Sequence, residues 1–287
     1  MQISEVINAV KGFCKGTDRD GNPIDSVSTR DQVLHGGVDR KCTGIVTTIY
    51  ASPEVIKKAA ALGANLIISH ETCFWCRGGH TAWLHDDPTF QAKSHLLDEL
   101  GITVWRCHDF IHSGVPLGAG GAYVDGIFYG LAHKLGWEEY CLSGDYFHSV
   151  YEIPETTLDG LARTIVSALG VNGARVIGAP GTPVRRVRIP GHAFGGNGDD
   201  HYITENRELN VDCELFLELV DFTIAAYVRD ANELGFDKCA ITVGHFDVEE
   251  PGMEYMVEWL PQALGALAEN LSLNYVQAGG FSRYLTA

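Results

Sequence analysis

Apolar and polar positions divide the chain into alternating short helices and strands. Apolar residues at helical spacing predict an opening helix over residues 3–14. A β-branched run at 44–50, a helix over 53–62 with Ser52 as its N-cap, and an apolar run at 65–69 then form a βαβ unit. Because the strands of such a unit lie parallel, this order predicts a parallel sheet.

The same alternation continues through both halves of the chain. A change to aromatic and polar residues between 137 and 149 places a domain boundary there. The sequence therefore predicts an α/β fold of two interlinked lobes, residues 1–149 and 150–287. The further elements that we expect are helices over 88–100, 122–135, 158–169, 222–234 and 253–267, and strands over 102–107, 174–177, 184–189 and 239–243.

Composition narrows the class of protein. The 287 residues include 21 Lys and Arg against 37 Asp and Glu, a formal net charge of −16, so general binding to a nucleic-acid backbone is not expected. Apolar residues make up 45% and charged residues 20%, which is typical of a globular protein. The first residues form neither a basic signal region nor a membrane-spanning run, so we expect a cytoplasmic protein without membrane contact.

Candidate ligands follow three of the predicted strands. In open α/β sheets, ligands collect at the carboxyl ends of the strands, so these side chains are expected to converge there, between the lobes. Imidazole together with carboxylate suits Zn, Fe, Mn or Ni better than Ca or Mg. The set is large enough for two ions, which could share a bridging water. Its members are His70 and Glu71; His108, Asp109 and His112; and His245, Asp247 and Glu249.

Each of these residues also has a simpler interpretation. A single histidine at a strand end is often solvated or satisfied within the core. Asp247 with Glu250 three positions later fits a capping box before the predicted last helix. The occurrence of such residues after three separate strands favours a metal site over these alternatives.

Four segments carry a resemblance to a known family. In chain order they are PEVIKKAAALGANLIISHETCFWCRGG, HDFIHSGVPLGAGGAYVDGIFYGLAHKLG, PETTLDGLARTIVSALG and VGHFDVEEPGMEYMVEWL. Their order and spacing resemble the Nif-three-like family of dinuclear metal-centre hexamers, some of which are named type-two GTP cyclohydrolase I. The resemblance covers about residues 44–260, and the closing G-H-x-x-x-E is its most specific element. The family's Trp-Asp-Asn-x-Gly-Leu pattern is absent between residues 16 and 37.

The resemblance implies a ligand set with two departures from the family pattern. His70 matches the first of two adjacent family histidines, and Glu71 stands in place of the second. His112 stands in place of an aspartate, four residues after His108, which matches a family histidine. Because these changes exchange one imidazole and one carboxylate, they preserve the ligand total. The implied metal ligands are His70, Glu71, His112, His245 and Glu249, with His108 orienting a ligand.

The implied function is that of a dinuclear, metal-dependent hydrolase. Its substrate would be a nucleotide or another small phosphorylated anion, attacked by a metal-activated water, with His108 or Asp109 as general acid or base. This includes an activity like that of GTP cyclohydrolase. The alternative is a non-catalytic metal-binding protein with a regulatory or interaction role. For either function the resemblance implies two divalent ions and a homohexamer.

Weaker features remain open. Cys73 and Cys76 have the spacing of a redox dithiol, although buried apolar cysteines are the simpler expectation. The glycines at 118–121 and the loop 191–198 could hold a phosphate on backbone amides, or could simply be flexible. Of the loop histidines, we expect one or two to contact a substrate; they are His80, His85, His148, His192 and His201.

Overall fold

The protein is described by a computed structural model that covers residues 1–76, 80–196, 199–269, 271–282 and 285. Two compact units share the chain. The first contains Met1–Gly130 and Gly252–Gly279, and the second contains Leu131–Pro251 and Gly280–Ala287. This division differs from the predicted one at 149 and 150, because the chain returns to the first unit near its end and the first crossing lies within a helix.

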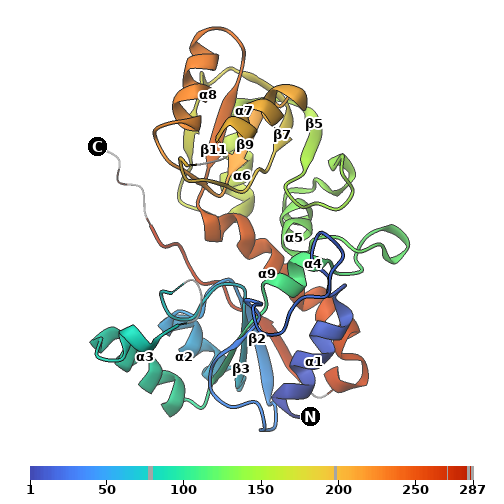
Figure 1. Cartoon of the computed structure of the whole chain (residues 1–287), viewed down its shortest axis with the longest axis vertical. Helices are drawn as coiled ribbons and strands as arrows, with labels where there is room; N and C mark the ends of the chain where they lie inside the picture. Colours follow the sequence, from blue (N-terminus) through green and yellow to red (C-terminus); the bar gives the residue numbers. More distant parts are fainter. Residues whose placement is uncertain (77–79, 197–198, 270, 283–284, 286–287) are drawn as a thin grey trace. The chain divides into compact units, whose positions relative to one another are not determined.

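The first unit is built on a five-stranded sheet with the order β1-β4-β3-β2-β12 (Figure 1). The four strands from β4 to β12 are parallel, and β1 at the edge is antiparallel. The predicted βαβ unit is therefore confirmed. The strands are β1 (Val33–His35), β2 (Gly44–Thr48), β3 (Leu66–Ser69), β4 (Thr103–Arg106) and β12 (Ser272–Tyr275). The helices are α1 (Ile3–Phe13), α2 (Pro53–Ala61), α3 (Pro88–Glu99), α4 (Asp109–Ser113) and the start of α5 (Gly126–Leu135).

Alternating side chains give this sheet two apolar faces. Val46 and Ile67 pack in one core cluster with residues of α2 and α3. Their neighbours Ile45 and Leu66 pack in another, with α1 and the later part of α9 (His245–Leu264). Because both faces are covered by helices, the strands are apolar almost throughout, as is usual for parallel strands.

The second unit has its own five-stranded sheet, ordered β5-β7-β9-β11-β6, and a separate pair of short parallel strands, β8 and β10. The strands are β5 (Val150–Thr157), β6 (Arg175–Ile177), β7 (Pro183–Arg188), β8 (His192–Ala193), β9 (Cys213–Phe216), β10 (Glu218–Leu219) and β11 (Cys239–Thr242). The helices are α6 (Leu158–Leu169), α7 (Asp199–Glu208) and α8 (Ile224–Glu233). The α/β fold predicted from the sequence is confirmed in both units.

Helix α9 corrects the predicted start of the last helix at residue 253. The helix begins at His245, so Asp247 lies within its first turn and the capping-box alternative is wrong. Within this helix Gly252 is needed for packing, because a Cβ atom there would lie 2.5 Å from the Cα of Ile127.

Short 3₁₀ segments complete the described secondary structure: η1 (Ala82–Leu84), η2 (Ala119–Gly121), η3 (Glu138–Tyr140) and η4 (Gly265–Ala268). Among the described residues, every helix is too short or too polar to cross a membrane.

Candidate metal centre

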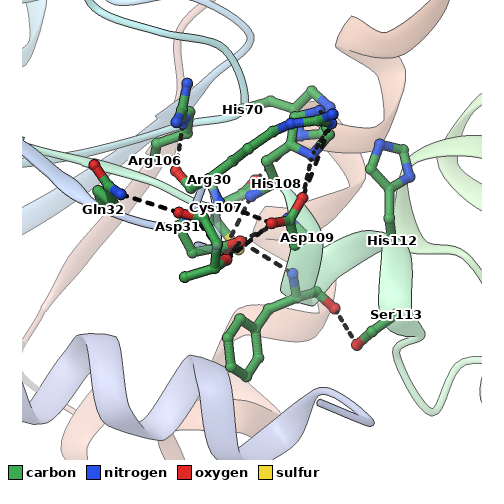
Figure 2. A network of polar contacts seen from close by, with 12 residues as sticks. Arg30, Asp31, Gln32, His70, Arg106, Cys107, His108, Asp109, His112 and Ser113 are labelled. Carbon is green, nitrogen blue, oxygen red and sulfur yellow. Dashed lines mark hydrogen bonds and ion pairs between the residues drawn. The ribbon is translucent and has the colours of Figure 1, made fainter. Parts of the chain in front are cut away.

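Three histidines gather at one edge of the first-unit sheet. His70 follows β3, and His108 follows its parallel neighbour β4 by two residues, so the two strands end at the same edge. His112 lies one helical turn further, in α4. One ring nitrogen of each lies within 4.8 Å of the others, and the ring centroids are 4.5 to 4.9 Å apart (Figure 2).

Two of these rings are oriented by acceptors behind them. The Nδ1 atom of His70, which is fully buried, lies 3.1 Å from the Cys107 carbonyl oxygen and must donate to it. The Nδ1 atom of His112 lies 2.7 Å from a carboxylate oxygen of the buried Asp125. When Nδ1 donates, Nε2 keeps its lone pair, which is the arrangement found in metal-binding histidines.

The third ring, that of His108, is bracketed by an anion and a cation. Its Nδ1 atom lies 3.0 Å from Asp109 Oδ1, and its Nε2 atom lies 3.2 Å from Arg30 Nη1. The same Arg30 atom also lies 3.4 Å from Nδ1, so the tautomer follows from Asp109: a carboxylate only accepts, and Nδ1 therefore carries the proton. Burial, followed by the neighbouring His70, lowers the pKa of His108 to about 3, which leaves the imidazole neutral at pH 7.

Residues 29–31, just before β1, hold His108 and Asp109 in place through hydrogen bonds. Asp31 accepts hydrogen bonds from the backbone N–H groups of His108 and Asp109. Asp109 in turn accepts from the Thr29 hydroxyl at 2.9 Å and from the Arg30 backbone N–H at 2.7 Å. Burial opposes ionisation of Asp109, but its hydrogen bonds, that from His108 first, outweigh burial and hold its pKa well below the usual range. The structure thus brings together His70, His108, Asp109 and His112 as predicted, and adds residues that the sequence patterns did not indicate.

The remaining predicted ligands are distributed over both units. Glu71 follows His70 and is half-buried. His245 and Glu249 lie in the second unit, one turn apart at the start of α9, with His245 Nε2 2.9 Å from Glu249 Oε2. The grouping of all five predicted ligands into one dinuclear centre stays a prediction.

A second group of possible ligands lies entirely within the second unit. It consists of His192, Glu218 and His245, whose ligand atoms also lie within 4.8 Å of one another. The Glu218 carboxylate accepts from His245 Nδ1 at 2.5 Å and also from His192 Nδ1. Burial raises the pKa of Glu218, but these hydrogen bonds outweigh burial and hold it at about 2. Glu218 directly follows the apolar residues 215–217, although Glu214 interrupts the run, so a similar strand-end signal precedes this carboxylate.

The donor sets of both groups fit a divalent transition metal. Imidazoles whose ring nitrogens are oriented by hydrogen bonds, joined in the second group by the Glu218 carboxylate, are ligands that Zn, Fe, Mn and Ni accept. Neither group has the cluster of oxygen ligands that Ca or Mg requires. Each group therefore has side chains of the types that bind a divalent transition-metal ion.

The weaker sequence features acquire structural explanations. Cys73 is fully buried, and burial raises the pKa of its thiol to about 11, so the thiolate that redox chemistry needs is scarce. All eight cysteines are free. Residues 122–125 separate the glycines at 118–121 from the start of α5. At that helix start the Asp125 carboxylate already accepts the N–H groups of Ile127 and Phe128, so these amides are not open to a phosphate. In the loop 191–198, residues 197 and 198 lie outside the described residues.

Comparisons with known proteins agree with the fold and the motifs. No family model matches the chain. A curated relative from Clostridium perfringens, named GTP cyclohydrolase 1 type 2 homolog, is 22% identical over 269 residues, which are 94% of this chain and 95% of the relative. Among solved structures, a Bacillus cereus protein related to NIF3 aligns with a TM-score of 0.70 at 13% identity, covering 100% of this chain and 99% of that one.

A second solved structure gives the same result. The Staphylococcus aureus protein SA1388 aligns with a TM-score of 0.68 at 15% identity, again over 100% of this chain and 99% of that one. The chain therefore has the fold of NIF3-related proteins, and the resemblance inferred from its motifs is confirmed.

Proposed function

We propose that this chain is a metal-dependent hydrolase that acts on a small anionic substrate, a nucleotide or another phosphorylated molecule. The observation that carries the proposal is the histidine cluster of the first unit, in which His70 and His112 each direct Nε2 away from an acceptor bonded to Nδ1. His70 and His112 would hold the metal in this unit, together with Glu71. A bound ion of this class lowers the pKa of a water molecule towards 7.

The neighbouring residues suit the remaining requirements of hydrolysis. The hydrogen bond between His108 Nδ1 and Asp109 Oδ1 orients the imidazole beside the cluster, and the general acid or base of the proposed reaction would come from this pair. Arg30 Nη1 lies 3.2 Å from His108 Nε2 on a half-exposed side chain. A guanidinium there supports binding of a phosphate in a chain whose net charge of −16 would otherwise repel it.

The test compares metal content with turnover. The full chain would be stripped with a chelator, reloaded with Zn, Mn, Fe or Ni, and assayed with GTP, other nucleotides and a generic phosphodiester. We expect multiple turnovers that require metal, loss of both metal and turnover in His112→Ala, and no change in His133→Ala, whose exposed side chain pairs with Glu138.

A further variant separates the roles within the cluster. His108→Asn is expected to retain its metal while losing turnover by about 10²- to 10⁴-fold. Equal loss of metal would instead make His108 a ligand. A fully loaded protein that turns over none of these substrates would favour the non-catalytic metal-binding alternative.

We also propose that the chain binds two divalent ions and assembles as a homohexamer, as the resemblance implies. Elemental analysis of reconstituted protein is expected to give about two ions per chain. Light scattering over a dilution series is expected to give six times the chain mass of 31.3 kDa. Monomer mass at every concentration would contradict the hexamer.

A further inference from the structure

We propose that Phe194 and Phe222 form an aromatic platform on the second unit that stacks the planar base of a nucleotide. This inference rests on the proposed function and deepens it, because it selects a nucleotide over other phosphorylated molecules as the substrate. Phe194, which directly follows β8, is thereby assigned as a residue that determines specificity.

The Phe194 ring is supported on one face and open to water. Its centroid lies 5.2 Å from that of the His192 imidazole, and the two rings are 8° from parallel. Even so, 57% of Phe194 is exposed. Because the imidazole covers one face of the phenyl ring, this exposure leaves the opposite face available. A planar ligand that stacks there would remove apolar surface from water.

The imidazole behind Phe194 is itself held in place. His192 lies in β8, directly opposite Glu218 of the parallel strand β10. Its Nδ1 atom donates a hydrogen bond to the Glu218 carboxylate, and its carbonyl oxygen accepts one from the Tyr202 hydroxyl. A platform with a fixed support loses little conformational freedom when a ligand binds, which favours affinity.

A second phenyl ring extends the apolar surface beside Phe194. Phe222 is 61% exposed, and its ring lies against the backbone of Gly195. A Cβ atom at Gly195 would collide with this ring, and the residue has a φ of 70°, so glycine suits both the turn and the close approach. Because Gly195 directly follows Phe194, the two exposed rings lie close together.

The platform lies beside a predicted metal ligand of the same unit. The centroid of the His192 ring is 4.9 Å from that of His245, so the rings of His245, His192 and Phe194 follow one another. A base stacked on Phe194 would therefore hold the ribose and phosphate of the same molecule near His245. Binding energy gained away from the reacting group would then serve to orient that group.

The size of the surface favours a small planar ligand over a second copy of the chain. The two rings together expose roughly 200–300 Å² of apolar surface. A stable interface between proteins buries about 800 Å² on each partner. Stacking of a nucleobase needs only one exposed aromatic face, and every base offers a matching face.

The test compares GMP with ribose 5-phosphate, which lacks the base. In calorimetric titrations of the full chain, the affinity for GMP is expected to be about 10- to 100-fold higher. Phe194→Ala should lower the affinity for GMP to that for ribose 5-phosphate and leave the latter unchanged. Phe194→Trp keeps a stacking surface and should retain GMP binding. The NMR signal of the GMP H8 proton should shift upfield with the wild-type protein and Phe194→Trp, but not with Phe194→Ala.

Phe236→Ala is the matched control, because Phe236 belongs to the same unit and is 67% exposed. It should leave both affinities unchanged, and circular dichroism would verify that each variant is folded. Equal affinities for the two ligands, loss of both in Phe194→Ala, or GMP binding that survives Phe194→Ala would overturn the proposal.

Two further outcomes separate this proposal from its neighbours. Dissociation of an assembly by Phe194→Ala, seen by light scattering, would show that a second copy covers the ring and would overturn the platform. Because the titrations measure binding and not turnover, a protein that binds GMP through Phe194 but hydrolyses none of the substrates would contradict only the proposed function.

Discussion

Asp31 Oδ2 accepts the backbone N–H of Asp109 at 2.6 Å, although the two residues are 78 positions apart. The other oxygen of Asp31 accepts the His108 N–H at 2.9 Å, so one buried carboxylate holds the turn between β4 and α4. Burial, followed by the charge of Asp109, raises the pKa of Asp31. The backbone hydrogen bonds oppose that rise. The segment that lacks the family's Trp-Asp-Asn pattern therefore still helps to present His108.

We expect Asp31→Asn to destabilise this turn. The amide has one acceptor oxygen, so its NH₂ group would face a backbone donor and leave it unsatisfied. The free energy of unfolding should fall by about 1–3 kcal/mol, measured by urea denaturation. The affinity of the histidine cluster for Zn²⁺ should fall by about 10- to 100-fold, as for other residues that orient metal ligands.

Asp25→Asn is the matched control for this change. Asp25 also accepts two backbone N–H groups, from Val27 and Ser28, but it is exposed. Its substitution should change stability by about 0.5 kcal/mol or less. Equal effects of the two substitutions would show that the buried position of Asp31 has no special role.

The sequence predicted the local elements well and the long-range partners poorly. Ser52 caps α2 by accepting the Val55 N–H, as expected from a cap followed by proline. By contrast, β12 joins the first sheet beside β2, across more than 200 residues, and no local pattern indicates such pairing. The edge strand β1 is three residues long, too short for periodicity to identify.

The same limit applies to the candidate site. The rule that ligands collect at strand ends identified His70, His108 and His112, which the structure brings together. It did not identify Asp31 or Asp125, whose roles depend on hydrogen bonds made only after folding. His192 was expected only as a loop histidine, because its pairing with Glu218 depends on a two-residue strand.

The exchange at Glu71 and His112 leads to a second prediction. If both side chains bind one ion, Glu71→His alone gives that ion an extra imidazole and one fewer negative charge. His112→Asp alone does the reverse. Each single variant should bind Zn²⁺ more weakly. The double variant restores the family's arrangement, so the coupling energy should be favourable and about 0.5–3 kcal/mol, obtained from four calorimetric titrations. Additive effects would show that the two residues do not share an ion.

Thiol labelling provides a third prediction. Cys73, Cys107 and Cys213 are fully buried, and burial raises the pKa of each thiol. Cys76 and Cys141 are partly exposed. In the folded protein at pH 8, a chromogenic disulfide reagent should react quickly with Cys76 and Cys141, and with the buried three only after addition of urea. Rapid formation of a bond between Cys73 and Cys76 would instead revive the redox hypothesis.

The fourth prediction concerns the buried carboxyl group of Glu214. Burial raises its pKa from 4.5 to about 7, against the opposing effects of Arg188 and the hydrogen bond from Asn206. The folded state therefore holds this proton more tightly than the unfolded state does. The resulting stabilisation is fully present below pH 4.5 and is lost as the pH rises through about 7.

Glu214→Gln should remove this pH dependence of stability, because an amide does not titrate. The amide oxygen can still accept the hydrogen bond that Asn206 Nδ2 now donates to Glu214 Oε1 at 2.9 Å. Between pH 5 and pH 8, the wild-type protein should lose about 1–3 kcal/mol more of its free energy of unfolding than the variant does, measured by urea denaturation at each pH. Glu233→Gln is the control, because Glu233 is exposed in its pair with Arg229 and should follow the wild-type profile. If Glu214→Gln also followed the wild-type profile, Glu214 would be ionised throughout this range, and its ion pair with Arg188, at 3.4 Å, would outweigh its burial.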